Sequence, residues 1–128
     1  MKNLLLIKLL LASLMALGQN KTELRGYVKN INSDTLILAK SREDLRYNGK
    51  EIPVIKGKEF KFILHYEYIE EYSLVYKSEL KKGAWKPINF FPNGNTIEFE
   101  LYPSTESQNN KIIGDKLSER KKQYQELF

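Results

Sequence analysis

The feature that most constrains the fold is a period-two alternation of apolar and polar residues, in short runs between positions 22 and 102. In the run 59–66 the two alternating sets are Phe60, Phe62, Leu64, Tyr66 and Glu59, Lys61, Ile63, His65. Such alternation gives a β-strand one apolar face and one solvent face. Many short strands with close turns are typical of two sheets that share a core. We therefore expect an all-β fold, an antiparallel β-sandwich of about seven to eight strands, with a small barrel as the alternative.

Turn residues and prolines set the expected boundaries of these strands. We expect strands at 22–30, 35–40, 51–55, 59–66, 72–77, 85–91 and 96–102. Pro53 and Pro87 cannot donate to a ladder, so 51–55 is expected to be an edge strand, and 85–91 is expected to be irregular or at a sheet edge. The polar segment 41–49 is expected to be a surface loop and 81–83 a turn. Asn93-Gly94 is favoured in type I′ turns and predicts a hairpin that joins 85–91 to 96–102.

Residues 1–18 have the layout of a secretory signal peptide. Lys2 precedes an apolar run of 14 positions from Leu4 to Leu17, and Ala16 and Gly18 are the small residues before a cut. The run is shorter than the ~20 residues that span a bilayer, so an uncleaved anchor or a buried helix is the weaker alternative. The chain contains no cysteine and so cannot carry a lipid there. We expect an exported protein, periplasmic or envelope-associated, with no lipid anchor and no stable membrane span after cleavage.

The character of the sequence changes after Pro103. A polar linker, 104–110, precedes a short expected strand at 112–113, and Asp115 is placed to cap a terminal helix at 116–127. A partial apolar stripe on that helix either packs on the sandwich or docks on something absent from this chain; its members are Leu117, Tyr124, Leu127 and Phe128. The expected division is a signal peptide at 1–18, a β-sandwich domain at 19–113, and at 114–128 a helix leading to an absent second domain.

The sequence shows no constellation that predicts catalysis, a cofactor or a metal site. His65 is the single histidine, and its place on the polar face of its strand predicts a surface residue. Glu98 and Glu100 share one strand face. Such a pair can do acid–base work or bind calcium, but pairing with lysines across the sheet is the favoured interpretation. The net charge is +5, or +3 without Lys2 and Lys8, and the basic residues are interleaved with acids, so we expect no nucleic-acid partner.

Aromatic residues supply the candidate contacts with a ligand or partner. Tyr residues concentrate between positions 66 and 76, and Trp85 follows. Aromatic rings on an open sheet face can stack on sugars or grip peptides, although alternation points several of these rings inward, where core packing is favoured. The candidate contact residues are Tyr66, Tyr68, Tyr76, Trp85, Tyr124 and Phe128.

The order of these segments resembles an uncharacterised N-terminal domain of bacterial envelope proteins, one that precedes a thioredoxin-like thiol–disulfide oxidoreductase domain. The resemblance rests on soft strand motifs, which include Asp34-Thr35-Leu36, Phe60-Lys61-Phe62, Gly94-Asn95-Thr96 and Ile112-Ile113-Gly114-Asp115. It implies a β-sandwich and a non-catalytic accessory or interaction domain, with a thioredoxin-like domain or another envelope protein as partner. No Cys-x-x-Cys pair is present, so no redox activity transfers to this chain. The alternative is a stand-alone carbohydrate- or peptide-binding module.

Overall fold

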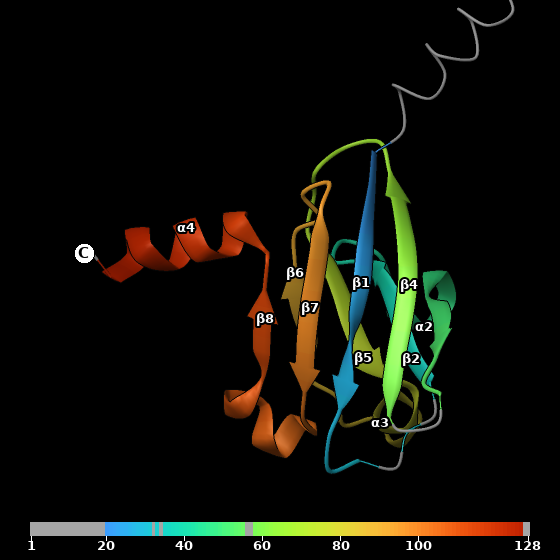
Figure 1. The fold of residues 1–128 in the computed structure, drawn as a ribbon. Helices are drawn as coiled ribbons and strands as arrows, with labels where there is room; N and C mark the ends of the chain where they lie inside the picture. The colour runs from blue at the N-terminus through green and yellow to red at the C-terminus, as the bar shows by residue number, and fades with distance from the viewer. Residues whose placement is uncertain (1–19, 32, 34, 56–57, 127–128) are drawn as a thin grey trace, which may run out of the picture.

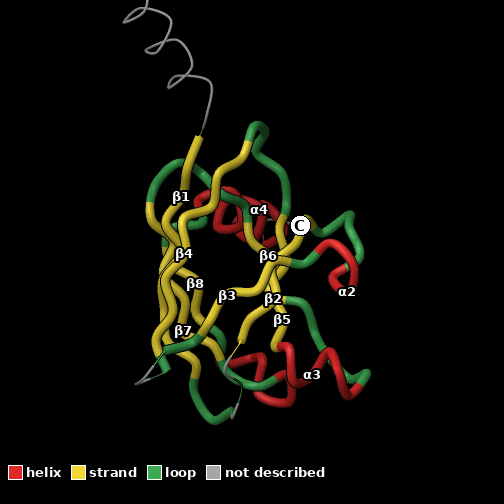
Figure 2. The backbone as a smooth tube through the Cα atoms, turned by 90° about the vertical axis from the view of Figure 1, so that its right-hand side faces the viewer, coloured by secondary structure: helices red, strands yellow, loops and turns green. Residues whose placement is uncertain are grey.

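The computed structural model describes residues 20–31, 33, 35–55 and 58–126, and these residues form a β-sandwich of two four-stranded sheets (Figures 1 and 2). The first sheet has the strand order β4-β1-β7-β8 and the second the order β3-β2-β5-β6. The strands are β1 (Asn20–Val28), β2 (Thr35–Lys40), β3 (Lys50–Pro53), β4 (Glu59–Tyr66), β5 (Tyr72–Tyr76), β6 (Ile88–Phe90), β7 (Thr96–Leu101) and β8 (Lys111–Ile113). The expected all-β sandwich is confirmed. The predicted signal peptide lies outside the described residues.

The pairing of the strands is antiparallel in every described ladder except β1 with β7, which is parallel. Strands β2 and β4 have the bounds expected from the sequence. The two segments that contain proline, β3 and the run around β6, lie at the two edges of the second sheet, as predicted. The described helices include none long and apolar enough to cross a membrane.

An aromatic row links the two sheets through the core. The Phe90 ring of the second sheet meets Phe99 of the first edge-on, with ring centroids 5.3 Å apart, and stacks at 6.0 Å on Tyr72. Phe99 in turn lies 6.0 Å from Phe60, although β1 separates their strands. The residue of β1 between them is Gly26, which pairs with both. A Cβ atom at Gly26 would lie 2.1 Å from the carbonyl oxygen of Phe99, so only glycine fits in this row.

The expected hairpin at Asn93-Gly94 is wrong. Strand β6 belongs to the second sheet and β7 to the first, so residues 91–95 cross from one sheet to the other. Hydrogen bonds to distant segments hold this crossing. The Gly94 N–H donates to Thr22 Oγ1 at 2.9 Å, and the Asn93 amide donates to the carbonyl of Gly114. Gly94 has a φ of 84°, so the dipeptide marks a turn, but the turn serves a sheet crossing.

Three short helical segments stand where loops or turns were expected. They are α2 (Leu45–Asn48), α3 (Lys77–Lys82) and a 3₁₀ segment, η1 (Ser104–Asn109). Asp44 caps α2 through the Arg46 N–H, and Gly83, in the left-handed conformation, ends α3. Both α-helices lie on the outer side of the second sheet (Figure 2). Their position explains why β5 is buried on both faces, against the simple alternation expected there.

The C-terminal part follows the expectation in its elements. Strand β8 covers the predicted strand, and helix α4 (Lys116–Glu126) begins after Asp115, whose carboxylate accepts from the Ser118 N–H at 3.1 Å. Helix α4 extends away from the sandwich (Figure 1), and Leu117 is 38% exposed. The predicted packing of the apolar stripe on the sandwich is therefore not found at Leu117. Leu127, Phe128 and the side chain of Tyr124 lie outside the described part of the chain.

Candidate functional site

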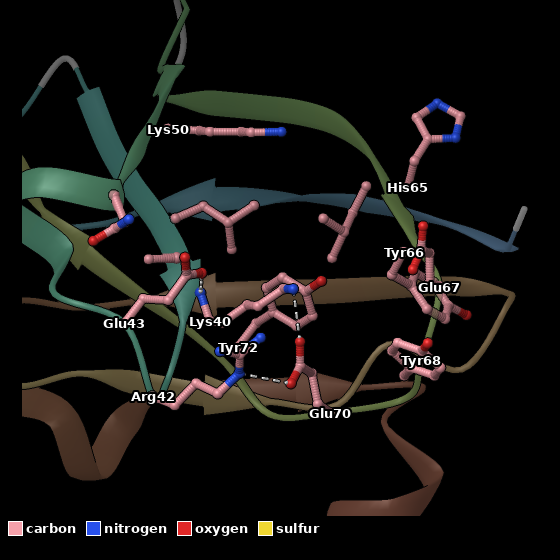
Figure 3. A pocket seen from close by; sticks show the side chains of 14 residues that line it. Lys40, Arg42, Glu43, Lys50, His65, Tyr66, Glu67, Tyr68, Glu70 and Tyr72 are labelled. Carbon is pink, nitrogen blue, oxygen red and sulfur yellow. Dashed lines mark hydrogen bonds and ion pairs between the residues drawn. The ribbon is translucent and has the colours of Figure 1, made fainter.

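An open cleft of about 540 Å³ lies at the side of the sandwich where β4 diverges from the second sheet (Figure 3). One wall is the end of β4 with the loop 67–71. The other wall is the end of β2, residues 42–43 and the start of β3 at Lys50. We call this hollow the tyrosine cleft, because Tyr66, Tyr68 and Tyr72 all line it. It forms where two edge strands, β4 and β3, border the same side of the sandwich.

The floor of the tyrosine cleft is apolar and firmly packed. Leu38 and Leu64 contribute from the two facing sheets and are 2% and 4% exposed. Tyr66 and Tyr72 are 6% and 5% exposed, so most of each ring belongs to the core. Thr22, itself fully buried, donates a hydrogen bond of 3.3 Å to the Tyr66 hydroxyl. Burial also raises the pKa of Tyr72, which stays a neutral phenol at physiological pH.

One rim of the cleft is held by a three-residue ion-pair cluster. Glu70, in the loop after β4, contacts Lys40 at 3.0 Å and Arg42 at 3.2 Å (Figure 3). The hydrogen bond from Lys40 is the main cause that lowers the pKa of Glu70, and the Arg42 guanidinium adds to it. The cluster ties the loop that carries Tyr68 to the end of β2 and so fixes the width of the cleft on this side.

Three further polar side chains of the rim form no ion pair. Lys50, His65 and Glu67 line the cleft, and none of them forms an ion pair with another described residue. The Lys50 side chain reaches across the upper part of the cleft, while His65 points away from its centre (Figure 3). Tyr68 stands at the opposite end and is 72% exposed. The cleft thus offers an apolar floor, one open aromatic ring and free charges of both signs.

The structure brings two of the six candidate contact residues together, Tyr66 and Tyr68. Tyr76 lies elsewhere: it is 2% exposed, burial raises its pKa, and its hydroxyl donates to the carbonyl of Tyr102 at 2.9 Å. Its ring therefore belongs to the core, and it does not line the cleft. Trp85 is 36% exposed in the segment before β6 and does not line the cleft. Phe128 and the side chain of Tyr124 are outside the described residues.

Two further expectations concern the charged residues of the first sheet. Glu98 pairs with Arg25 at 2.6 Å, and Glu100 pairs with Lys29 and Lys111 on the neighbouring strands. The expected cross-strand pairing of these carboxylates with basic residues is confirmed, and it involves an arginine as well as lysines. His65 is exposed on the polar face of β4, as predicted. No three His, Asp or Glu side chains of the described ranges gather as a metal site would require.

The sequence did not single out the basic residues of the cleft. Lys40 ends one strand, Arg42 follows in a polar loop and Lys50 begins another strand, so no local pattern links them. Pairing of β2 with β3 brings Lys50 opposite Leu38, which places it beside the cleft floor. The only part of the cleft that the sequence indicated was its group of tyrosines, which are close together between positions 66 and 76. Comparison of the chain with protein-family models, curated proteins and solved structures finds no match.

Proposed function

We propose that this protein is an exported, non-catalytic interaction module that binds a polypeptide partner in the tyrosine cleft. The observation that carries the proposal is the combination of an apolar floor with unpaired Lys50 and Glu67 on the rim. Ligand sites are concave, mostly apolar and supplied with a few polar groups that fix orientation, and a volume of about 540 Å³ lies in their usual range.

A polypeptide suits this cleft better than a small anion or cation. The rim has free charges of both signs, so it has no net preference for a ligand of one charge. A polypeptide offers apolar side chains for the floor at Leu38 and Leu64, together with charged groups for Lys50 and Glu67. The open ring of Tyr68 supplies contact area at low conformational-entropy cost, as tyrosines do in many recognition surfaces.

Two features of the sequence support the cellular setting of this module. The leader-like residues 1–18 support export to the periplasm or cell envelope. The resemblance to the domain that precedes thioredoxin-like oxidoreductases names the partner to expect first, a thioredoxin-like domain or another envelope protein. The module would hold or orient that partner, and the chemistry would belong to the partner.

The test compares two exposed tyrosines. Peptides selected from a displayed library on the wild-type protein are measured by calorimetry against Tyr68→Ala and Tyr47→Ala, since Tyr47 is 84% exposed but lies outside the cleft. We expect Tyr68→Ala to weaken binding about 10-fold, the loss of roughly 1.4 kcal/mol for one aromatic contact, and Tyr47→Ala to change it less than 2-fold. Equal effects of the two substitutions would contradict binding of the peptide in the tyrosine cleft.

A carbohydrate is the second candidate ligand. The observation that favours it is the Tyr68 ring, 72% exposed at the end of the cleft, because open aromatic rings stack on sugars. A glycan array read with the same two variants separates the candidates. A glycan that binds the wild-type protein and is lost only in Tyr68→Ala would favour the carbohydrate and displace the polypeptide.

A further inference from the structure

Strand β4 has a free edge along the tyrosine cleft. Its partner in the first sheet is β1, on one side only. On its other side the described residues provide a single bridge, from the Ile55 N–H to the Glu59 carbonyl at 2.8 Å, at the very start of the strand. Beyond Glu59 the backbone on this side forms no ladder with a described strand.

The bond to Ile55 also shows which residues face the free edge. In an antiparallel ladder the N–H and C=O of one residue point to the same side, and successive residues alternate. Glu59 points to the free side, whereas the carbonyl of Lys58 accepts a hydrogen bond from the Val28 N–H of β1. By the same alternation Lys61, Ile63 and His65 present their backbone groups at the free edge. Exposed edges of this kind are templates for strand addition.

The side chains beside this edge define what a strand added there would carry. One face of such a strand would continue the interior row of Leu64 and Tyr66, over the floor of the cleft. The other face would continue the outer row of Lys61, Ile63 and His65, all exposed. Residues directly across a ladder on the same face interact, so the exposed ammonium of Lys61 favours an acidic partner beside it.

We propose that the polypeptide bound by the cleft adds to β4 as a further strand of the first sheet, with apolar side chains over Leu38 and Leu64 and an acidic side chain at the alternate position beside Lys61. This inference rests on the proposed function and gives it a binding mode and a sequence preference. The unpaired ammonium of Lys50 lies over the same cleft and can pair with one acidic side chain of the added strand, as the Glu67 carboxylate can pair with a basic one.

The backbone part of the proposal is tested with N-methylated peptides. The probe is acetyl-Glu-Leu-Glu-Leu-Glu-amide, and two further probes carry N-methyl groups on either the glutamate or the leucine nitrogens. A strand that adds to one edge uses only one of these sets. We expect one methylation pattern to weaken binding more than 10-fold and the other less than 3-fold, with NMR shifts of the Ile63 and His65 amides on titration. Equal affinities for both methylated probes would overturn strand addition.

The side-chain part is tested with matched charge reversals on the two edge strands of the first sheet. Lys61 of β4 and Lys111 of β8 are both outward-facing, with side chains 70% and 71% exposed, and each pairs with one glutamate of the neighbouring strand. At low salt we expect Lys61→Glu to weaken the probe about 3- to 10-fold, and Lys111→Glu less than 2-fold. The same loss in both variants would contradict the proposed edge.

The proposed function and the binding mode fail in distinguishable ways. If library peptides depend on Tyr68 but neither N-methylation nor Lys61→Glu changes their affinity selectively, the cleft binds polypeptides and the strand-addition mode is wrong. If no peptide depends on Tyr68, the proposed function itself is wrong.

Discussion

Asp115 should be the most sensitive polar residue of the described chain, because one buried carboxylate holds two elements together. It is 1% exposed. Its Oδ1 accepts from the Ser118 N–H at 3.1 Å, and its Oδ2 accepts from the Ser118 hydroxyl at 2.6 Å and from the Phe91 N–H at 2.9 Å. The first two bonds cap helix α4, and the third ties the start of that helix to the crossing between the sheets.

The cost of Asp115→Ala follows from these bonds. Loss of an N-cap costs about 1 kcal/mol. The Phe91 N–H, whose bond to Asp115 is part-buried, would also lose its partner, and a donor left unsatisfied in a buried position costs about 1–3 kcal/mol. Since the two effects share one side chain, we take their sum as an upper range and expect the free energy of unfolding to fall by about 2–4 kcal/mol.

The matched control is Asp44→Ala. Asp44 is also a helix cap, bonded to the Arg46 N–H at 2.9 Å, but its side chain is 41% exposed and it bridges no second element. We expect a loss of about 0.5–1 kcal/mol for this variant. Urea unfolding followed by far-UV circular dichroism measures both. If Asp115→Ala lowers the free energy of unfolding no more than Asp44→Ala does, the bond from the Phe91 N–H to Asp115 does not add to the stability of the fold.

Three further predictions concern the core and the cleft rim. Gly26→Ala should destabilise the fold by more than about 3 kcal/mol in urea unfolding, because its Cβ would collide with the Phe99 backbone carbonyl. Tyr76→Phe should cost about 1 kcal/mol, the hydrogen bond to the Tyr102 carbonyl, while the ring stays packed. The depressed pKa of Glu70 implies a contribution that is present above the ordinary glutamate pKa of about 4.3 and is lost as pH falls through the lower folded-state value. The protection factors of the amides in loop 67–71, with the intrinsic exchange rate at each pH divided out, should therefore fall on acidification, and Glu70→Gln should abolish that change.

The sequence predicted the strands well where one face of a strand is buried and the other is exposed to solvent. Strand β4 alternates cleanly because it lies at a sheet edge with one face to the core, so its bounds and inward residues followed from the period. Strand β5 did not follow the same rule, because α3 and its neighbours cover its outer face. Helix α2 lies within a polar segment that is expected to be a loop, and α3 begins at Lys77, the last residue of an expected strand, and runs into the expected turn at 81–83.

Tertiary contacts decided the features that the sequence could not. Asn93-Gly94 has hairpin chemistry, yet its bonds to Thr22 and Gly114 turn the chain toward the other sheet. The cleft is a similar case. Its tyrosines are close in sequence and gave a signal, but Lys40 and Lys50 reach it through the pairing of β2 with its two neighbours. The sequence therefore indicated the aromatic part of the site and not its charges.

The two sheets are joined differently along the two sides of the sandwich. On the side of β6 and β8, polar bonds join segments of the two sheets. Lys86 donates to the Ser107 hydroxyl, Asp115 accepts from the Phe91 N–H, and Ser104 donates to Glu79.

On the side of β3 and β4, the sheets diverge past the Ile55–Glu59 bridge. Among the described residues that line the cleft, the only ion pairs are those of Glu70 with Lys40 and Arg42, and they lie on its exposed rim. Exposed ion pairs contribute little to stability, about 0–1 kcal/mol each. The polar bonds between the sheets are therefore weaker on this side than on the opposite one. The cleft lies open between β4 and the start of β3, which is why we place polypeptide binding there.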